Sequence, residues 1–552
     1  ISGFSVGTAY LIFVGCMWLV GGVGLKSLVS ELGGGKKSGW LACLLFLMLP
    51  AHLFLLSYGN GLHHLTISML SAIIFIWLKA LKKWNILWPV LLILLISLTL
   101  LIDVGGILAV VVAGITVIFL GPRQDWLEGW VKLILVVLTA ISIATIWYTP
   151  RFWWILLGNP SFGGKPLANV IPFILQLLQA IIPLLLGVWF VQKRYRLTDK
   201  LTLFGVLFGS SFLFLTLIRF LSDVDFWMDW TGYFLELQLA VSVLGGILLS
   251  RYIKRWYITL IIISILTISN GAIFFKLYKP NEKDSVYKKG ILQMISSQVL
   301  PGSRVFLSGS PVFWLGAVKQ NLLQVRGGRD EVSTHPTWAM GAYQIREGID
   351  IEILRNWLSV FGVSELIYHS ESSREPFKDF KNPERFKEFS EVISDSPNTV
   401  ITFNAFIARR AVPEITVVAK PKEGSDKEAL AAYQKTLGEP LNFQYDAREL
   451  LIEGQLRGDQ VVSAAVTADP SWRLKGSGGK LKADAFGNIV IVPATGTETS
   501  WRLIYEEGFF WIPGLLMSII SMAFVSQSGR IINLFARKIP SLATPADEEK
   551  EY

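Results

Sequence analysis

The sequence predicts a polytopic α-helical membrane protein, with an extracytoplasmic α/β part and a β-sandwich-like part placed before its last membrane span. Hydrophobic residues make up 52% of the 552 residues, charged residues make up 17%, and the mean hydropathy is +0.49. This composition is too apolar for a soluble protein and indicates many membrane spans. A long polar stretch, residues 277–508, separates the last apolar segment from the others.

We predict eleven spans, because eleven apolar stretches are long enough to cross roughly 30 Å of hydrocarbon. They lie near residues 4–25, 39–57, 64–79, 86–102, 105–120, 131–150, 167–191, 201–219, 233–250, 256–276 and 509–526. The loops between them alternate in character. The basic loops contain Lys26/Lys36/Lys37, Lys79/Lys82/Lys83, Arg123/Lys132, Lys193/Arg194/Arg196/Lys200, Arg251/Lys254/Arg255 and Arg530/Arg537/Lys538. The loops poor in Lys and Arg are 58–63, 103–104, 151–166 and 220–232.

This alternation follows the positive-inside rule, so the basic loops are predicted to be cytoplasmic. We therefore expect a multi-pass plasma-membrane protein with residues 277–508 outside the cytoplasm and the tail 527–552 inside. The same alternation places Ile1 outside. We accordingly expect the sequence to be a fragment with at least one further span upstream.

The net charge of +9 does not indicate nucleic-acid binding. Residues 277–508 carry 28 Lys and Arg against 29 Asp and Glu, whereas the rest of the chain carries 23 against 13. The basic excess therefore lies in the apolar part, as expected for cytoplasmic membrane loops. The expected partner is the lipid bilayer and not nucleic acid.

The predicted domain boundaries follow changes in pattern. Residues 1–276 hold ten spans. Residues 277–412 are predicted to be α/β: segments 304–310 and 365–370 are strands, and between them lies a helix that Asp350 caps and Gly362 ends. The segment 383–393 is a predicted helix and 399–408 a strand. Residues 413–439 form a polar connector, residues 440–508 alternate as in a β-sandwich, and 509–526 is the final span.

No soluble-type catalytic signature is present. The sequence has no P-loop and no G-x-S-x-G motif. The histidines are His52, His63, His64, His335 and His369, and their spacing matches no zinc motif. Cys16 and Cys43 lie in apolar runs. No metal site is predicted from these residues.

The first candidate site is the predicted outer loop RFLSDVDFWMDWTGYFLELQ, residues 219–238. Arg219 could hold a lipid-linked phosphate, and Asp223, Asp225 or Asp229 could bind a divalent cation or a sugar hydroxyl. The alternative is a polar loop that keeps a helical hairpin in register. Glu236 lies just inside the next span, where an ionisable side chain indicates function unless water reaches it.

The other short outer loops add candidates. His63 and His64 lie at the outer mouth of the third span, where at most one of two adjacent histidines is expected to enter a site. Ordinary interfacial polarity is the alternative. Asp103 is predicted to be a solvated span edge. Arg151 and Lys165 belong to an aromatic and glycine-rich segment that we expect to be interfacial or re-entrant.

The segment QVRGGRDEVSTHPTW, residues 324–338, is a candidate glycan-binding loop. Its candidate contact residues are Arg326, Arg329, Asp330, His335 and Trp338. Arginine and tryptophan suit sugar or phosphate contacts, and loops on a rigid scaffold often carry binding. The alternative is a structured loop that packs onto the membrane domain.

The chain resembles the bacterial and archaeal membrane proteins of the 6-pyruvoyl-tetrahydropterin-synthase-related, or YfhO-like, group, which belong with the GT-C glycosyltransferases. The segments that carry the likeness are LMLPAHLFLLSYGNGLHHLTISMLSAIIFIWLKAL, FWWILLGNPSFGGKP, QVRGGRDE with GAYQIREGIDIEILRNWLSVFGVSELIYHS, FKDFKNPERF and DPSWRLKGSGGKLKADAFGNIVIVPA. They cover most of the chain. Their motifs are loose, so they specify the architecture better than the substrate.

The resemblance implies a glycosyltransferase that takes a sugar from a polyprenyl-phosphate donor on the outer face of the membrane. An envelope glycan or glycoprotein would be the acceptor. The principal catalytic acids of such enzymes would lie in an outer loop upstream of Ile1. Relatives often carry an arginine where the ninth span begins, but DWTGYFLEL has none. The alternative function is a non-catalytic transporter, or an envelope protein that binds glycan or has a structural role.

Overall fold

The computed structural model divides the chain into two compact units, each described by itself below. Unit 1 comprises Ile1–Arg151, Val170–Lys279 and Phe510–Tyr552, and unit 2 comprises Phe152–Asn169 and Pro280–Phe509. The structure describes residues 6–57, 61–122, 125–158, 170–194, 199–221, 233–252, 256–278, 304–307, 323–325, 333–369, 378–389, 391–395, 398–402, 409–413, 419–446, 448–476, 478–495, 497–506, 508 and 511–538.

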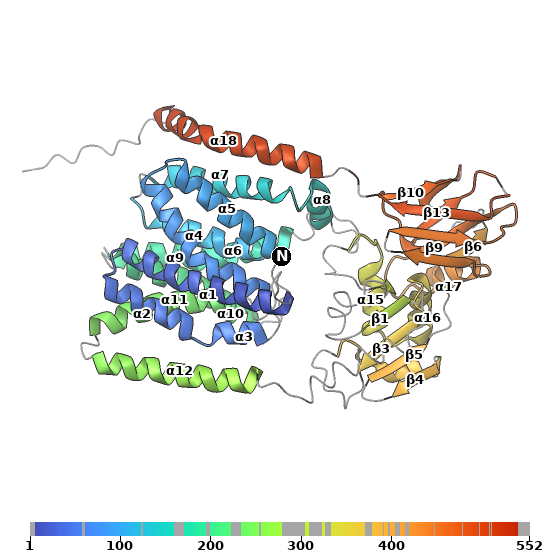
Figure 1. Ribbon diagram of the computed structural model, residues 1–552, viewed down its shortest axis with the longest axis horizontal. Coiled ribbons are helices and arrows are strands. Elements are labelled where there is room, and N and C mark those ends of the chain that lie inside the picture. The colour runs from blue at the N-terminus through green and yellow to red at the C-terminus, as the bar shows by residue number, and fades with distance from the viewer. Residues whose placement is uncertain are drawn as a thin grey trace, which may run out of the picture. The chain divides into compact units, whose positions relative to one another are not determined.

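Unit 1 is built from helices, and every predicted span overlaps at least one described helix (Figure 1). The helices are α1 (Val6–Glu31), α2 (Lys36–Met48), α3 (Ala51–Ser57), α4 (Gly61–Lys82), α5 (Leu87–Ile102), α6 (Gly106–Phe119), α7 (Trp126–Ala144), α9 (Val170–Arg194), α10 (Lys200–Leu221), α11 (Phe234–Tyr252), α12 (Trp256–Tyr278) and α18 (Trp511–Lys538). The short helix α8 (Pro150–Gly158) lies in the predicted interfacial segment, and all but its first two residues belong to unit 2. The predicted second span is divided into α2 and α3 at Pro50.

The predicted multi-pass membrane class is confirmed by the length and composition of these helices. Six of the described helical segments are long and apolar enough to cross a membrane: Ile12–Glu31, Lys36–Leu56, Gly61–Lys82, Trp126–Ala144, Lys200–Ile218 and Phe234–Tyr252. Shorter apolar helices run over Leu87–Ile102, Gly106–Phe119, Leu177–Phe190, Ile261–Ile273 and Trp511–Phe524. The orientation of the protein in the membrane stays a prediction.

Small residues allow helix backbones in unit 1 to approach closely, as is common in membrane bundles. A Cβ atom on Gly21 of α1 would lie 2.5 Å from the carbonyl oxygen of Ser68 in α4. Ser71 of α4 donates its hydroxyl hydrogen to the Gly21 carbonyl at 2.6 Å. At the other end of the chain, Ser518 of α18 donates to the carbonyl of Ser142 in α7 at 2.8 Å.

Ion pairs join helix ends that the sequence places on the cytoplasmic side. Glu31 at the end of α1 lies 2.6 Å from both Lys79 and Lys82 near the end of α4. Arg251 at the end of α11 lies 2.6 Å from Asp199, which precedes α10. The contacts therefore agree with the predicted alternation of the loops.

Unit 2 contains one five-stranded sheet and two four-stranded sheets. The first sheet has the order β2-β1-β3-β5-β4, in which β1 is parallel to β2 and β3 and the other pairs are antiparallel. Its strands are β1 (Arg304–Leu307), β2 (Leu323–Gln324), β3 (Glu365–His369), β4 (Glu391–Asp395) and β5 (Asn398–Thr402). With it fold the helices α15 (Trp338–Arg346) and α16 (Ile351–Val360) and the 3₁₀ helix η4 (Pro383–Glu388).

The other two sheets have the orders β10-β13-β8-β7 and β11-β12-β9-β6 and are antiparallel throughout. Their strands are β6 (Arg409–Pro413), β7 (Asn442–Asp446), β8 (Glu449–Glu453), β9 (Gln460–Thr467), β10 (Trp472–Lys475), β11 (Lys480–Ala483), β12 (Asn488–Val492) and β13 (Ser500–Tyr505). One core joins both sheets, because Ile452 and Trp501 of the first pack in the same cluster as Val462 and Ile491 of the second. The predicted β-sandwich is confirmed.

Local predictions in unit 2 had mixed outcomes. Asp350 caps α16 by accepting hydrogen bonds from the amides of Glu352 and Ile353, and Gly362 follows the helix with φ of 62°, so the predicted capped helix is confirmed. The predicted helix over 383–393 is wrong at its end, because residues 391–393 belong to β4. The predicted connector contains a helix, α17 (Lys427–Thr436).

Candidate functional site

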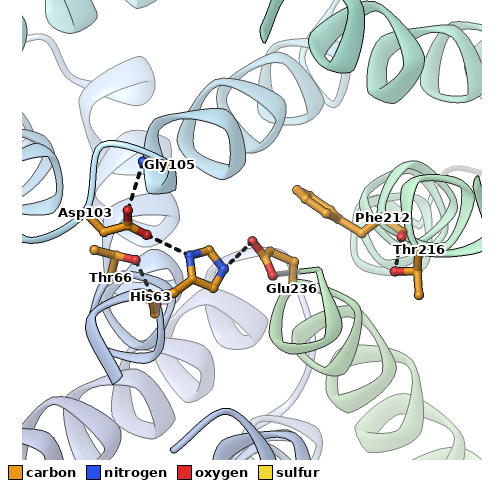
Figure 2. Close-up of polar contacts among 7 residues, drawn as sticks. All are labelled: His63, Thr66, Asp103, Gly105, Phe212, Thr216 and Glu236. Carbon is orange, nitrogen blue, oxygen red and sulfur yellow. Dashed lines mark hydrogen bonds and ion pairs between the residues drawn. The ribbon is translucent and has the colours of Figure 1, made fainter. Parts of the chain in front are cut away.

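Three helix ends of unit 1 meet in a buried polar cluster (Figure 2). His63 lies in the first turn of α4, Asp103 is the residue that ends α5, and Glu236 lies in the first turn of α11. These ends lie in or next to loops 58–63, 103–104 and 220–232, and all three loops are on the predicted outer side. Helix α5 ends where α4 and α11 begin, so packing of these helices brings together side chains that are far apart in sequence.

Both ring nitrogens of His63 contact a carboxyl group. The Nδ1 atom lies 2.9 Å from Asp103 Oδ2, and the Nε2 atom lies 3.2 Å from Glu236 Oε1. The side chains of His63 and Glu236 are each only 1% exposed, whereas that of Asp103 is 12% exposed. Figure 2 shows the imidazole ring between the two acids. An imidazole with an acceptor at each nitrogen can donate through both when it is doubly protonated.

Local structure holds each acid in place. Asp103 Oδ1 accepts a hydrogen bond from the amide of Gly105 at 3.1 Å, so both carboxylate oxygens of Asp103 are engaged. Glu236 points inward from the start of α11, where its carboxylate also lies near the positive end of the helix dipole. Its second oxygen, Oε2, is buried without a hydrogen-bond partner among the described residues.

A pair of histidines lies beside this cluster. His52 of α3 and His64 of α4 are fully buried, and their Nδ1 and Nε2 atoms are 2.8 Å apart. The rings of Trp18 and Phe46 pack against His52, with ring centroids 4.9 and 4.6 Å away. One nitrogen must donate and the other accept, so the pair shares one proton when both rings are neutral.

Gln238 of α11 fixes the chain that carries His52. Its side-chain nitrogen donates to the carbonyl of Phe46 in α2 at 2.9 Å, and its side-chain oxygen accepts from the amide of Ala51 at the start of α3. The break between the helices frees such backbone groups, because Pro50 disfavours helical backbone at Leu49, which is extended. A side chain that satisfies them is needed where no water can reach.

The cluster offers groups that can act as acids and bases. Among the described residues, no three His, Cys, Asp or Glu side chains are placed to hold a metal ion. Imidazole and carboxyl groups in hydrogen-bond contact can accept, pass on and release protons. Ionisable side chains buried in a membrane bundle are costly and indicate a functional site.

The predicted site residues have different outcomes. The structure brings His63 and Glu236 together, and it buries His64 against His52. Both adjacent histidines are buried, His63 in the cluster and His64 against His52. The expectation that at most one of them enters a site stays a prediction. Asp103 is a partner of His63 and only 12% exposed, so it is not the solvated span edge that was predicted. His52 was not predicted to belong to a site, and Pro50, which breaks a span next to it, is the only local signal.

Only some of the other predicted site residues are among the described residues. Arg219 lies in the last turn of α10, and Arg151 lies in α8. Asp223, Asp225, Asp229 and Lys165 lie outside the described residues. Their proposed roles with phosphate, sugar or a divalent cation stay predictions.

The prediction of a glycan-binding loop is wrong for two of its residues. His335 and Trp338 are buried, at 7% and 6% exposure, so neither presents a surface to a glycan. Trp338 packs on Phe361 in the core of the α/β part, and His335 contacts Asn488. Arg326, Arg329 and Asp330 lie in the part of the chain that the structure does not describe.

Burial also changes the proton affinity of His335. Its surroundings exclude water and lower its pKa to about 4, and the positive charge of Arg304 acts in the same direction. The side chain is therefore neutral at physiological pH. It accepts a hydrogen bond at Nδ1 from the amide of Thr337 at 3.3 Å. His335 thus serves to join the loop before α15 to β12.

No protein-family model matches the chain, and no curated protein matches it. Solved structures of the arabinofuranosyltransferase AftD from Mycobacteria, determined by single-particle cryo-EM, are similar at 13% identity and a TM-score of 0.42, over 79% of this chain and 37% of that one. A mutant of AftD matches at 11% identity and a TM-score of 0.39, over 91% of this chain and 53% of that one. The chain thus spans less than two thirds of the length of these proteins. Similarity at this level identifies neither a family nor a function for the chain.

Proposed function

We propose that the protein is a membrane glycosyltransferase of the GT-C type, which transfers a sugar from a polyprenyl-phosphate donor at the outer face of the membrane. The observation that carries the proposal is the convergence of His63, Asp103 and Glu236 at helix ends that the loop charges place on one side. A lipid-linked sugar would be presented at this boundary between water and hydrocarbon. The resemblance of the sequence to GT-C glycosyltransferases points to the same activity.

The cluster suits the chemistry of glycosyl transfer. The reaction breaks the bond between the anomeric carbon of the sugar and the phosphate oxygen, which leaves with the electron pair. A new bond forms between the anomeric carbon and the oxygen of an acceptor hydroxyl, which loses its proton. A positioned carboxylate or imidazole that accepts this proton typically accelerates such a step by about 10²–10⁴-fold.

The donor and the acceptor also need binding sites. Arg219, Arg151 and Lys165 are the basic residues that we assign to the donor phosphate, because a departing phosphate requires positive charge. Unit 2 is proposed to be extracytoplasmic and to bind the acceptor, an envelope glycan or glycoprotein.

The test uses the full-length protein in lipid nanodiscs and undecaprenyl-phosphate sugars that carry a radiolabelled hexose or pentose. We expect saturable binding of at least one donor and transfer of its sugar to a membrane glycan fraction. The absence of both binding and transfer for the whole panel would contradict the proposal. A matched sample of heat-denatured protein measures non-specific partition of the lipid donor.

A proton-coupled transporter is the second candidate, because buried histidine and carboxyl side chains also form the proton relays of transporters. His52, His63 and His64 lie in this region with Asp103 and Glu236, which gives more ionisable groups than the span sequences alone suggested. Proteoliposomes loaded with a pH-sensitive dye separate the two functions. A change in internal pH when lipid-linked sugar is added to one side, without sugar transfer, would favour the transporter.

A further inference from the structure

We infer that Glu236 is the proton acceptor of this site, and that His63 and Asp103 pass the proton from it toward solvent. The inference rests on the proposed function and assigns a direction to the three side chains. The hydrogen bonds described above give partners to some polar atoms of the cluster and leave another without one. His63 uses both nitrogens on the two acids, so its ring has no nitrogen left for a substrate.

Among the described residues, one carboxylate oxygen of the cluster lacks a hydrogen-bond partner. Asp103 Oδ2 contacts His63 and Asp103 Oδ1 contacts the Gly105 amide. Glu236 Oε1 contacts His63, but Glu236 Oε2 has no hydrogen-bond partner among the described residues although the side chain is 1% exposed. Burying an acceptor without a partner is unfavourable, so a group that is retained in this state is expected to meet a donor during function. A substrate hydroxyl is such a donor.

The two ends of the relay differ in access to water. Glu236 and His63 are both 1% exposed, whereas Asp103 is 12% exposed and lies in the turn between α5 and α6. The hydrogen bonds run from Glu236 through His63 to Asp103, and the most exposed side chain is at the Asp103 end. Glu236 is therefore the inner end, His63 the link, and Asp103 the end from which a proton reaches solvent.

The proton transfer balances. At the start, the imidazolium of His63 donates from Nε2 to Glu236 and from Nδ1 to Asp103. The acceptor hydroxyl gives its proton to Glu236 Oε2 while its oxygen bonds to the anomeric carbon, and the donor phosphate leaves with the electron pair of the broken bond. The Nδ1 proton then moves to Asp103 and from there to water, which leaves Glu236 protonated and His63 neutral. Transfer of the proton on Glu236 to His63 restores the starting state. The three side chains carry the same net charge before and after.

The test compares Glu236→Gln with Glu128→Gln in the full-length protein and in the nanodisc assay. Glu128 lies in α7, and its carboxylate pairs with Lys132 at 2.5 Å, so the control removes a carboxylate charge elsewhere in the bundle. We expect Glu236→Gln to lower the turnover number about 100-fold or more and to leave donor binding within about twofold of wild type. Glu128→Gln is expected to keep wild-type turnover.

Asp103 acts through His63 and is a positioning residue, so its test includes a rescue. Asp103→Asn is expected to lower turnover about tenfold and to increase the solvent deuterium isotope effect on turnover, and Asp103→Glu is expected to restore most of both. Turnover of Glu236→Gln within threefold of wild type would overturn the inference and leave the proposed function standing. A parallel loss of donor binding would also overturn it, because Glu236 would then act in binding or folding. Failure of the wild-type protein to bind or transfer any donor would instead refute the proposed function.

Discussion

The side-chain oxygen of Gln238 accepts a hydrogen bond from the backbone amide of Ala51 at 2.9 Å, across the break that separates α2 from α3. The side-chain nitrogen of Gln238 donates to the carbonyl of Phe46 on the other side of the break. One side chain of α11 therefore supplies partners for both broken helix ends. The position of His52, the next residue after Ala51, depends on this bridge.

Replacing Gln238 by Leu is expected to destabilise the membrane unit. The substitution leaves the Ala51 amide and the Phe46 carbonyl without partners, at about 1–3 kcal/mol for each buried group. The midpoint of thermal unfolding in detergent measures the effect. Gln179→Leu in α9 is the matched control, because Gln179 Oε1 has no hydrogen-bond partner among the described residues. A midpoint for Gln238→Leu equal to that of the control would contradict the proposed bridge.

Gly21→Ala is expected to separate α1 from α4. The added methyl group would lie 2.5 Å from the Ser68 carbonyl oxygen and 2.9 Å from the Phe46 ring, so one backbone must move. Overpacking of this kind typically costs about 1–3 kcal/mol. Gly15 is on the same helix with nothing within 4 Å of its Cβ position. Gly15→Ala should therefore melt at or slightly above the wild-type temperature, since alanine favours helix by about 1 kcal/mol.

His335 is expected to make unit 2 sensitive to acid. Its folded-state pKa of about 4 lies below the ordinary value of 6.5, so the unfolded chain takes up a proton first as the pH falls. The stabilisation is therefore complete above about pH 6.5 and decreases steadily toward pH 4. Hydrogen exchange of peptides from α15 and β12 in the full-length protein measures it. In His335→Gln the slope between these pH values should be smaller, and an unchanged slope would show that other groups cause the sensitivity.

Asp350 is expected to stabilise α16 as its N-cap. Asp350→Ala should cost about 1 kcal/mol, because two amides of the first turn lose their acceptor, whereas Asp350→Asn keeps the acceptor. The hydrogen bond from Lys427 holds the pKa of Asp350 below its usual value. The contribution is thus present at neutral pH and is lost as the pH falls through the folded-state pKa. Hydrogen exchange in α16 should show equal protection in Asp350→Asn and wild type at acid pH.

The sequence predicted the helices of unit 1 well, because span length and hydropathy follow from the thickness of the membrane. It also placed the capped helix at Asp350, where the signal is local. The end of the predicted helix 383–393 was wrong because its apolar residues also suit a buried strand, and pairing of β4 with β5 decided the outcome.

The candidate site was only partly visible in the sequence. Glu236 and His63 were predicted to belong to a site because they are ionisable residues in or beside spans, but Asp103 was predicted to be solvated. Which helix ends meet is set by packing between α4, α5 and α11, and no periodicity in the sequence encodes it. His335 and Trp338 were misassigned for a related reason, because a polar and aromatic loop gives no local sign of burial.

Unit 2 is assembled from two separate stretches of chain, residues 152–169 and 280–509, so the chain passes between the two units four times. A body anchored in this way cannot diffuse away from the helices, whatever the strength of any other contact. A molecule bound to unit 2 would therefore stay tethered to the helices, and its later encounters with them would be intramolecular.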